Sequence, residues 1–194
     1  MRQYEVFELC FEAGAGQSDL TAEFELGGKR VVRKGFFEGG VYKVRFLPVD
    51  SGLCRWKVWG AASASGEEEC LPADNGRHGP VRASGLHFEY DDKSPYYPFG
   101  TTVYALIPQP DELVERTLFS LSRSPFNKLR FCIFPKHYEF NHNEPPFFAF
   151  EKGGDGSWDV NRPCTEFWQR LEKIIARLDK MGIECDLILF HPYD

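Results

Sequence analysis

Between residues 99 and 190, apolar runs alternate with segments of helical periodicity, and this alternation limits the fold more than any other feature of the sequence. The apolar runs Phe99–Ile107, Leu129–Phe134 and Ile183–Phe190 are typical of buried strands. One candidate helix between them begins near Asp111, and another includes Phe167–Leu178. A strand–helix–strand–helix–strand order needs crossover connections, so it predicts a parallel sheet of about three strands.

The ends of the two candidate helices have their own signals. Asp111 is a residue type that caps helix N-termini, and Pro125 ends the first helix. Pro163 suits the first turn of the second helix, and Gly182 is placed to end it. Residues 135 to about 162 are expected to form a long loop.

Up to about residue 90 the hydrophobic pattern has a period of two. Val41–Leu47 alternates apolar and charged residues, and Gly27-Gly28 indicates a tight hairpin turn between two strands. Ser63–Gly66 is expected to be a loop. Short strands with frequent turn signals predict an antiparallel β-sandwich of the immunoglobulin-like kind.

The length of the chain does not allow a complete barrel after such a sandwich. A (β/α)8 barrel takes about 250 residues, and the whole chain has 194. We therefore expect a sandwich domain at 1–85, followed at 86–194 by a truncated (β/α)8 barrel with about three parallel strands. Open strand edges need cover. The chain is thus expected to be a piece of a longer protein or a homo-oligomer that completes its core by association.

Composition and charge argue against several classes of function. The net charge is −6 and no Lys/Arg-rich run occurs, so nucleic acid is not an expected partner. No apolar stretch reaches the roughly 18 residues of a membrane span. Residues 1–12 lack the regions of a signal peptide, so a cytoplasmic location is expected. The 6 cysteines form no C-x-x-C pair, so we expect reduced thiols, no metal site and no cofactor.

Several motifs spread along the chain match one family in order and spacing. They are G-V-Y-K-V-R-F-L-P at 40–48, H-G-P-V at 78–81, P-Y-Y-P-F-G-T-T-V-Y-A-L at 95–106, S-P-F-N-K at 124–128, F-P-K at 134–136 and D-L-I-L-F-H-P-Y-D at 186–194. By these motifs the chain resembles bacterial glycoside hydrolases of the apiosidase-like type. Members of that family have an N-terminal β-sandwich before a (β/α)8 barrel.

The resemblance implies a retaining carbohydrate hydrolase acting on a plant-type or other complex carbohydrate. Such enzymes use two carboxylates about 5–5.5 Å apart, expected at the ends of barrel strands four and seven. This chain reaches only strand three, so no catalytic residue is assigned and the chain alone is expected to be inactive. The alternative is a carbohydrate-binding or self-associating module without hydrolytic activity.

Substrate contacts are expected after the barrel strands, because barrel active sites lie at the carboxyl ends of the strands. After the second strand, Lys136 and Asn141 are candidates to hydrogen-bond sugar hydroxyls, and Tyr138 is a candidate to stack on a ring. The alternative for this segment is a solvated loop with a packed aromatic. In the first strand, Tyr104 either faces the substrate or packs in the core.

After the third strand, His191, Tyr193 and Asp194 are candidates to bind sugar hydroxyls or to orient a catalytic group. The alternative is a mobile terminus. Glu139 and Glu144 are not assigned as a catalytic pair, because nothing in the sequence fixes their separation.

Two further features stay open at the level of sequence. The aromatic residues Phe147, Phe148, Phe150 and Trp158 either pack against the folded core or form a platform for sugar. His78 is expected to be a hinge or interface residue near the connection between the two domains.

Overall fold

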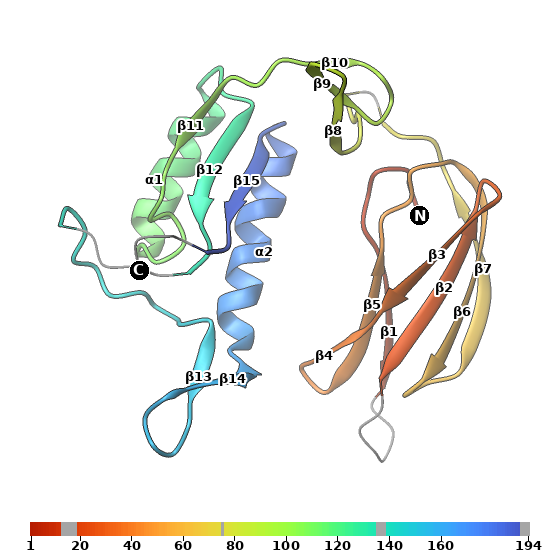
Figure 1. Ribbon diagram of the computed structural model, residues 1–194, viewed down its shortest axis with the longest axis horizontal. Helices are drawn as coiled ribbons and strands as arrows, with labels where there is room; N and C mark the ends of the chain where they lie inside the picture. Colours follow the sequence, from red (N-terminus) through yellow and green to blue (C-terminus); the bar gives the residue numbers. More distant parts are fainter. Residues whose placement is uncertain (13–18, 75, 135–138, 191–194) are drawn as a thin grey trace. The chain divides into compact units, whose positions relative to one another are not determined.

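The computed structural model describes residues 1–12, 19–74, 76–134 and 139–190 (Figure 1). By its internal contacts the chain divides into two compact units, Met1–Tyr97 and Pro98–Asp194. Each unit has its own hydrophobic core. The domain boundary expected at residues 85 and 86 stays a prediction.

The described part of the first unit consists of antiparallel sheets. One sheet has the strand order β1-β5-β4, a second has the order β3-β2-β6-β7, and a small third has the order β10-β9-β8. The strands are β1 (Phe7–Glu12), β2 (Leu20–Leu26), β3 (Lys29–Lys34), β4 (Phe36–Glu38), β5 (Val41–Phe46), β6 (Gly52–Gly60), β7 (Ala64–Cys70), β8 (Val81–Ser84), β9 (His87–Tyr90) and β10 (Pro95–Tyr96).

The two larger sheets enclose one core, and the period-two pattern of the sequence places it. Phe24 of β2 and Phe46 of β5 stack between the sheets with ring centroids 4.5 Å apart. Phe7 of β1 meets Phe24 edge-on at 6.5 Å. Phe24 is fully buried and Phe46 is 5% exposed. Burying each such side chain contributes about 1.5–3 kcal/mol, so these rings hold the sheets face to face.

The hairpin turn predicted at Gly27-Gly28 is confirmed. Both glycines have positive φ, 58° and 73°, as a two-residue turn of the favoured twist requires. Leu26 pairs with Lys29 across the turn.

The loop expected at Ser63–Gly66 is wrong, because β7 already begins at Ala64. Gly66 lies opposite Trp56 in the β6–β7 ladder. A Cβ atom at Gly66 would lie 2.5 Å from the Trp56 ring. The glycine therefore makes room for an indole ring within a strand, rather than marking a turn.

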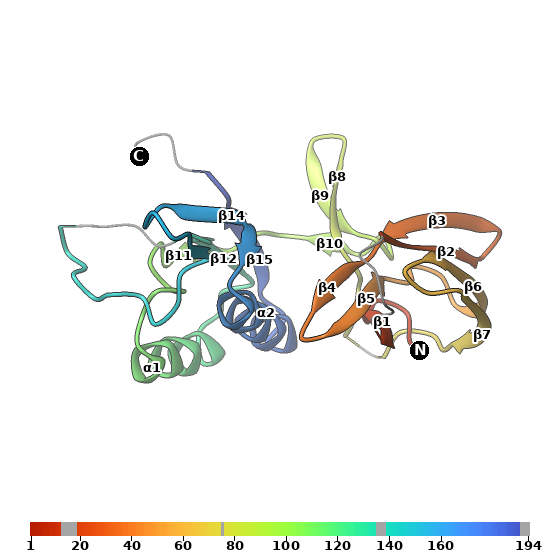
Figure 2. The same ribbon diagram turned by 90° about the horizontal axis from the view of Figure 1, so that it is seen from below.

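The second unit contains the predicted parallel sheet. Strand β12 (Lys128–Cys132) pairs in parallel with β11 (Gly100–Thr102) on one side and with β15 (Glu184–Ile188) on the other. Helices α1 (Asp111–Ser122) and α2 (Thr165–Lys180) both lie on one face of this sheet (Figure 2). The core between helices and sheet includes Leu118, Leu129, Phe131, Phe167 and Leu178.

The first expected strand is shorter than the apolar run that predicted it. After Thr102, the Val103 amide still donates to the Arg130 carbonyl at 2.9 Å, and the chain then turns, with Leu106 N donating to Val103 O at 3.2 Å. Leu106 and Ile107 are each 1% exposed. Their apolar character therefore reflects burial in a loop rather than membership of a strand, and Tyr104 lies in that loop.

Three other local expectations are corrected. Asp111 is the first residue of α1 and makes no capping bond, because Pro110 occupies the N-cap position. Pro163 is the last residue of β14, and α2 begins at Thr165. The expected long loop contains a hairpin of β13 (Phe150–Lys152) and β14 (Trp158–Pro163). The predicted end of α2 is confirmed, since Gly182 follows it with a φ of 71°.

The sheet face opposite the helices is charged. Leu129 and Phe131 are buried in the core, whereas Lys128 and Arg130 alternate with them and pair with Asp186 at 3.1 and 2.9 Å. Burial alone raises the pKa of Asp186, but hydrogen bonds from Lys128 and Arg130 outweigh it and lower that pKa. The helix-free face is therefore suited to polar contacts.

Within the described ranges, no helix is both long and apolar enough to cross a membrane. Those ranges include all six cysteines, and none of them is in a disulfide bond. Burial raises the pKa of the Cys185 thiol to about 12, so this thiol stays protonated at neutral pH.

Substituting Gly66→Ala should destabilise the first unit by about 1–3 kcal/mol, because the added methyl group overlaps the Trp56 ring. The matched control is Ser65→Ala on the same strand, where the side chain is exposed and the change should be within about 0.5 kcal/mol. Urea unfolding monitored by circular dichroism measures both. Equal stability of the two variants would show that the Trp56 ring does not need the glycine.

Candidate functional site

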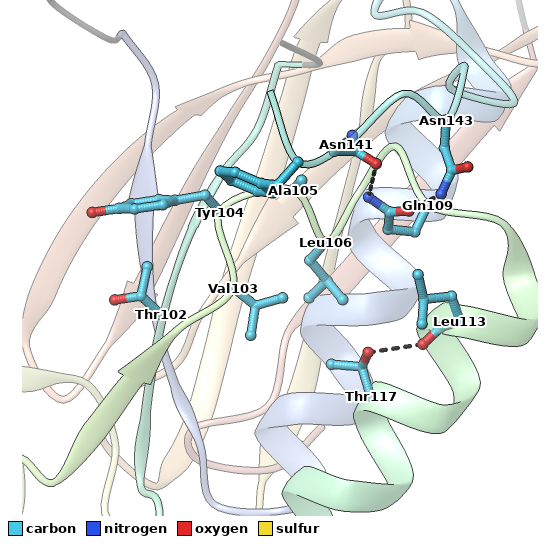
Figure 3. Close-up of a pocket in the computed structure, with 11 residues that line it drawn as sticks. Thr102, Val103, Tyr104, Ala105, Leu106, Gln109, Leu113, Thr117, Asn141 and Asn143 are labelled. Carbon is cyan, nitrogen blue, oxygen red and sulfur yellow. Dashed lines mark hydrogen bonds between the residues drawn. The ribbon is translucent and has the colours of Figure 1, made fainter. Parts of the chain in front are cut away.

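A cavity of about 420 Å³ lies in the second unit where β11 ends (Figure 3). Its walls come from residues 102–106 and Gln109, from Leu113 and Thr117 of α1, and from residues 140, 141 and 143. This is the carboxyl edge of the parallel sheet, since β11 and β12 run in the same direction. Ligands of open α/β sheets and of barrels bind at this edge.

Three side-chain amides form a connected group at one end of the cavity. Gln109 Nε2 donates to Asn141 Oδ1 at 3.0 Å, and Asn143 Nδ2 donates to Gln109 Oε1 at 2.7 Å. Gln109 and Asn141 are 8% and 9% exposed. Each amide has two donor hydrogens and an acceptor oxygen with two lone pairs. The group can therefore donate and accept toward a ligand while keeping the bonds that orient it.

Arg170 of α2 fixes the loop that supplies Gln109. Its Nε donates to the Ile107 carbonyl at 3.1 Å and its Nη2 donates to the Gln109 carbonyl at 2.6 Å. Its Nη1 pairs with Asp111. The Arg170 side chain is 13% exposed. One planar guanidinium thus binds two backbone carbonyls of the loop before α1, which a lysine could not do with the same geometry.

The other end of the cavity is lined by hydroxyl groups and a ring. Thr102 and Tyr104 point their hydroxyl groups in the same direction, away from Gln109 and Asn143 (Figure 3). Tyr104 is 42% exposed and Phe140 is 77% exposed. The Tyr104 carbonyl accepts from Cys132 N at 3.1 Å, so the backbone of this residue is tied to β12. Exposed rings beside amides offer both stacking and hydrogen bonding.

The structure brings two of the predicted contact residues into this one cavity, Tyr104 and Asn141. Lys136, Tyr138, His191, Tyr193 and Asp194 lie outside the described residues.

Sequence reasoning missed Gln109 and Asn143. A usable signal existed for Gln109, because it is a polar residue held between Pro108 and Pro110 in the loop after a strand. Asn143 had no comparable signal.

Glu139 and Glu144 are both exposed and do not line the cavity. Among the described residues, no group of three or more His, Cys, Asp or Glu side chains is placed to hold a metal ion. The cavity's described lining supplies hydrogen bonds and ring faces.

His78 belongs to a hydrogen-bonded group in the first unit that resembles a catalytic triad in composition only. His78 Nδ1 lies 2.7 Å from Asp92 Oδ2, and Ser94 Oγ lies 3.2 Å from the same ring nitrogen. A triad needs the serine and the carboxylate on different nitrogens of the imidazole. Burial alone raises the pKa of Asp92, but bonds from Ser94 and His78 outweigh it and lower that pKa. The group therefore stabilises the turn between β9 and β10.

The chain is similar to one family profile and to several solved structures. Residues 1–60 match a family profile described as a domain of unknown function, DUF5060. A solved structure described as "a putative glycoside hydrolase" from Bacteroides vulgatus is 36% identical, with a TM-score of 0.92. The match covers 100% of this chain and 42% of that chain, so the chain spans less than half of the length of this relative. No curated protein matches the chain.

Two more distant solved structures also have hydrolase descriptions. One is described as a glycoside hydrolase and is 15% identical, with a TM-score of 0.40 over 57% of this chain and 25% of that chain. The other is a family 39 glycoside hydrolase from Bacteroides cellulosilyticus. It is 14% identical, with a TM-score of 0.26 over 92% of this chain and 30% of that chain. Scores this low support no conclusion about this chain.

Substituting Arg170→Met should lower the free energy of unfolding by about 2–3 kcal/mol, because the Ile107 and Gln109 carbonyls lose a charged donor. The control is Arg177→Met on the same helix, where the pair with Glu115 is exposed and its loss should cost much less, because solvent screens it. Urea unfolding gives both values. A loss for Arg177→Met as large as that for Arg170→Met would contradict the role of Arg170.

Proposed function

We propose that this chain is the N-terminal part of a glycoside hydrolase of the apiosidase-like type and that it supplies carbohydrate contacts. The similarity to the Bacteroides vulgatus structure supports this, because 36% identity extends over the full length of the chain. The proposed substrate of the intact protein is a plant-type or other complex carbohydrate.

The proposal includes a finer fold assignment for each unit. The first unit would be an immunoglobulin-like sandwich, which two antiparallel sheets around one core support. The second would be the start of a (β/α)8 barrel, for which the parallel order β11-β12-β15 with two crossover helices is the supporting observation.

The observation that carries the proposal is the cavity at the carboxyl edge of the parallel sheet. Sugar hydroxyl groups both donate and accept hydrogen bonds, and a side-chain amide can pair with them in both roles. They also present apolar ring faces, which stack on exposed aromatic rings. Gln109 and Asn141 provide the first property, and Tyr104 and Phe140 provide the second.

The residues that follow the same strands complete the proposed contacts. Lys136 and Tyr138 come after β12 in the chain, and His191, Tyr193 and Asp194 come after β15. We keep them as proposed substrate contacts because parallel strands end at one edge. The catalytic carboxylates are proposed to lie in other strands of the barrel, so this chain alone should bind sugar without cleaving it.

Self-association is a second candidate function. In the described part of the chain, β11 and β15 are the outer strands of the parallel sheet. Outer strands present unpaired backbone groups that pair readily with another chain. A homo-oligomer joined through these edges would pair the backbone groups of the two outer strands.

Titration calorimetry of the purified chain with pectic and other plant-type oligosaccharides tests the main proposal. Tyr104→Ala should weaken binding about fivefold, because loss of a stacking ring costs about 1 kcal/mol. Gln109→Leu should weaken it similarly, since it removes both amide bonds. Phe119→Ala is the matched control, because this ring is 62% exposed on α1 and does not line the cavity.

Aryl glycosides and the same oligosaccharides should not be hydrolysed above the rate without protein. Turnover by the pure chain would overturn the placement of catalysis in other strands. Light scattering on the same samples separates the second candidate. A multiple of the chain mass with no sugar binding would favour self-association over carbohydrate recognition.

A further inference from the structure

The base of the β13–β14 hairpin is fixed in the core of the second unit. Ala149 is 5% exposed, and its carbonyl accepts from Trp168 Nε1 and from Cys164 N, each at 3.0 Å. The rings of Phe150 and Trp168 meet at 6.4 Å. The hairpin therefore leaves the core at a defined place rather than as a loose loop.

Beside this base, two aromatic rings remain exposed next to each other. The ring centroids of Phe148 and Trp158 are 4.8 Å apart, with 36° between the ring planes. Phe148 is 39% exposed and Trp158 is 46% exposed. Val160, two residues further along β14, is 68% exposed. Adjacent exposed apolar side chains mark binding surfaces more often than scattered ones do.

A cation lies over one of these rings. Lys152 is paired with Trp158 across the hairpin, and its Nζ lies 5.1 Å from the centre of the Trp158 ring. The neighbouring Arg162 is engaged with Glu151. The surface thus combines exposed rings with a strong N–H donor that lies over the Trp158 ring.

We propose that Phe148, Trp158 and Lys152 form a second carbohydrate contact, separate from the cavity, that stacks one pyranose ring of a longer oligosaccharide. Phe148 and Trp158 would cover the apolar face of the sugar, and Lys152 would donate to one of its oxygens. Figure 1 shows the hairpin on the side of the sheet toward which β12 and β15 run, the side where the cavity lies. This inference rests on the proposed function.

The size of the patch favours a sugar over a protein partner. A stable protein interface buries about 800 Å² on each partner, far more than two rings and one valine present. A pyranose needs only one ring face and a few hydrogen bonds. The hairpin is therefore matched to a single sugar residue.

The test uses calorimetry on the full chain. It compares a pectic hexasaccharide with a disaccharide from the same polysaccharide. Trp158→Ala should weaken hexasaccharide binding about fivefold and leave disaccharide binding unchanged, because the short sugar occupies only the cavity. Trp158→Phe should retain most of the affinity. Phe119→Ala is the control for loss of an exposed ring, and thermal unfolding checks that each variant folds.

The two proposals fail in different ways. If Tyr104→Ala weakens both sugars while Trp158→Ala changes neither, the second contact is refuted and the proposed function stands. If the unaltered chain binds neither sugar, both are refuted. If Trp158→Ala instead reduces the mass of an oligomer in light scattering, the hairpin is a contact between protein chains and the sugar assignment is wrong.

Discussion

The parallel pairing of β12 with both β11 and β15 determines where everything else in the second unit can lie. Because the three strands run in the same direction, their carboxyl ends share one edge. The loop with Tyr104 and Gln109 leaves from that edge, and the segment with Asn141 and the β13–β14 hairpin follows β12. Arg170 then ties the first of these loops to α2 through the carbonyls of Ile107 and Gln109. The strand pairing therefore defines the carboxyl edge of the sheet, and the Arg170 guanidinium holds the loop with Gln109 at that edge.

The high aromatic content of 15% has two physical explanations in the structure. Phe24 and Phe131 are fully buried and build the cores of the two units. Tyr104 and Phe140, which line the cavity at the carboxyl edge of the sheet, remain 42% and 77% exposed, and Trp158 of the hairpin remains 46% exposed. Rings of the first kind stabilise the fold, and rings of the second kind leave apolar surface in water. The proposals for the cavity and the hairpin assign that exposed surface to sugar.

Much of the fold could be predicted because hydrophobic periodicity reports burial directly. The period of two placed β5, the glycine pair placed the turn between β2 and β3, and the apolar runs placed β12 and β15, whereas β7 was missed. The same signal failed at Leu106 and Ile107, which are buried without belonging to a strand. It also failed at the hairpin, whose strands have mostly exposed residues and so lack an alternating pattern. Asn143 was missed because its role depends on a hydrogen bond with Gln109, 34 residues away in the chain, and a contact at that separation leaves no local pattern.

The central claim is that the carboxyl edge of the parallel sheet binds carbohydrate. Amide hydrogen exchange, with and without a saturating oligosaccharide, locates the bound sugar on the chain without any substitution. The account predicts slower exchange in residues 103–109 and 139–143, with residues 1–97 unchanged. Slower exchange confined to residues 1–97 would contradict this account. So would unchanged exchange along the whole chain at a saturating concentration of the oligosaccharide.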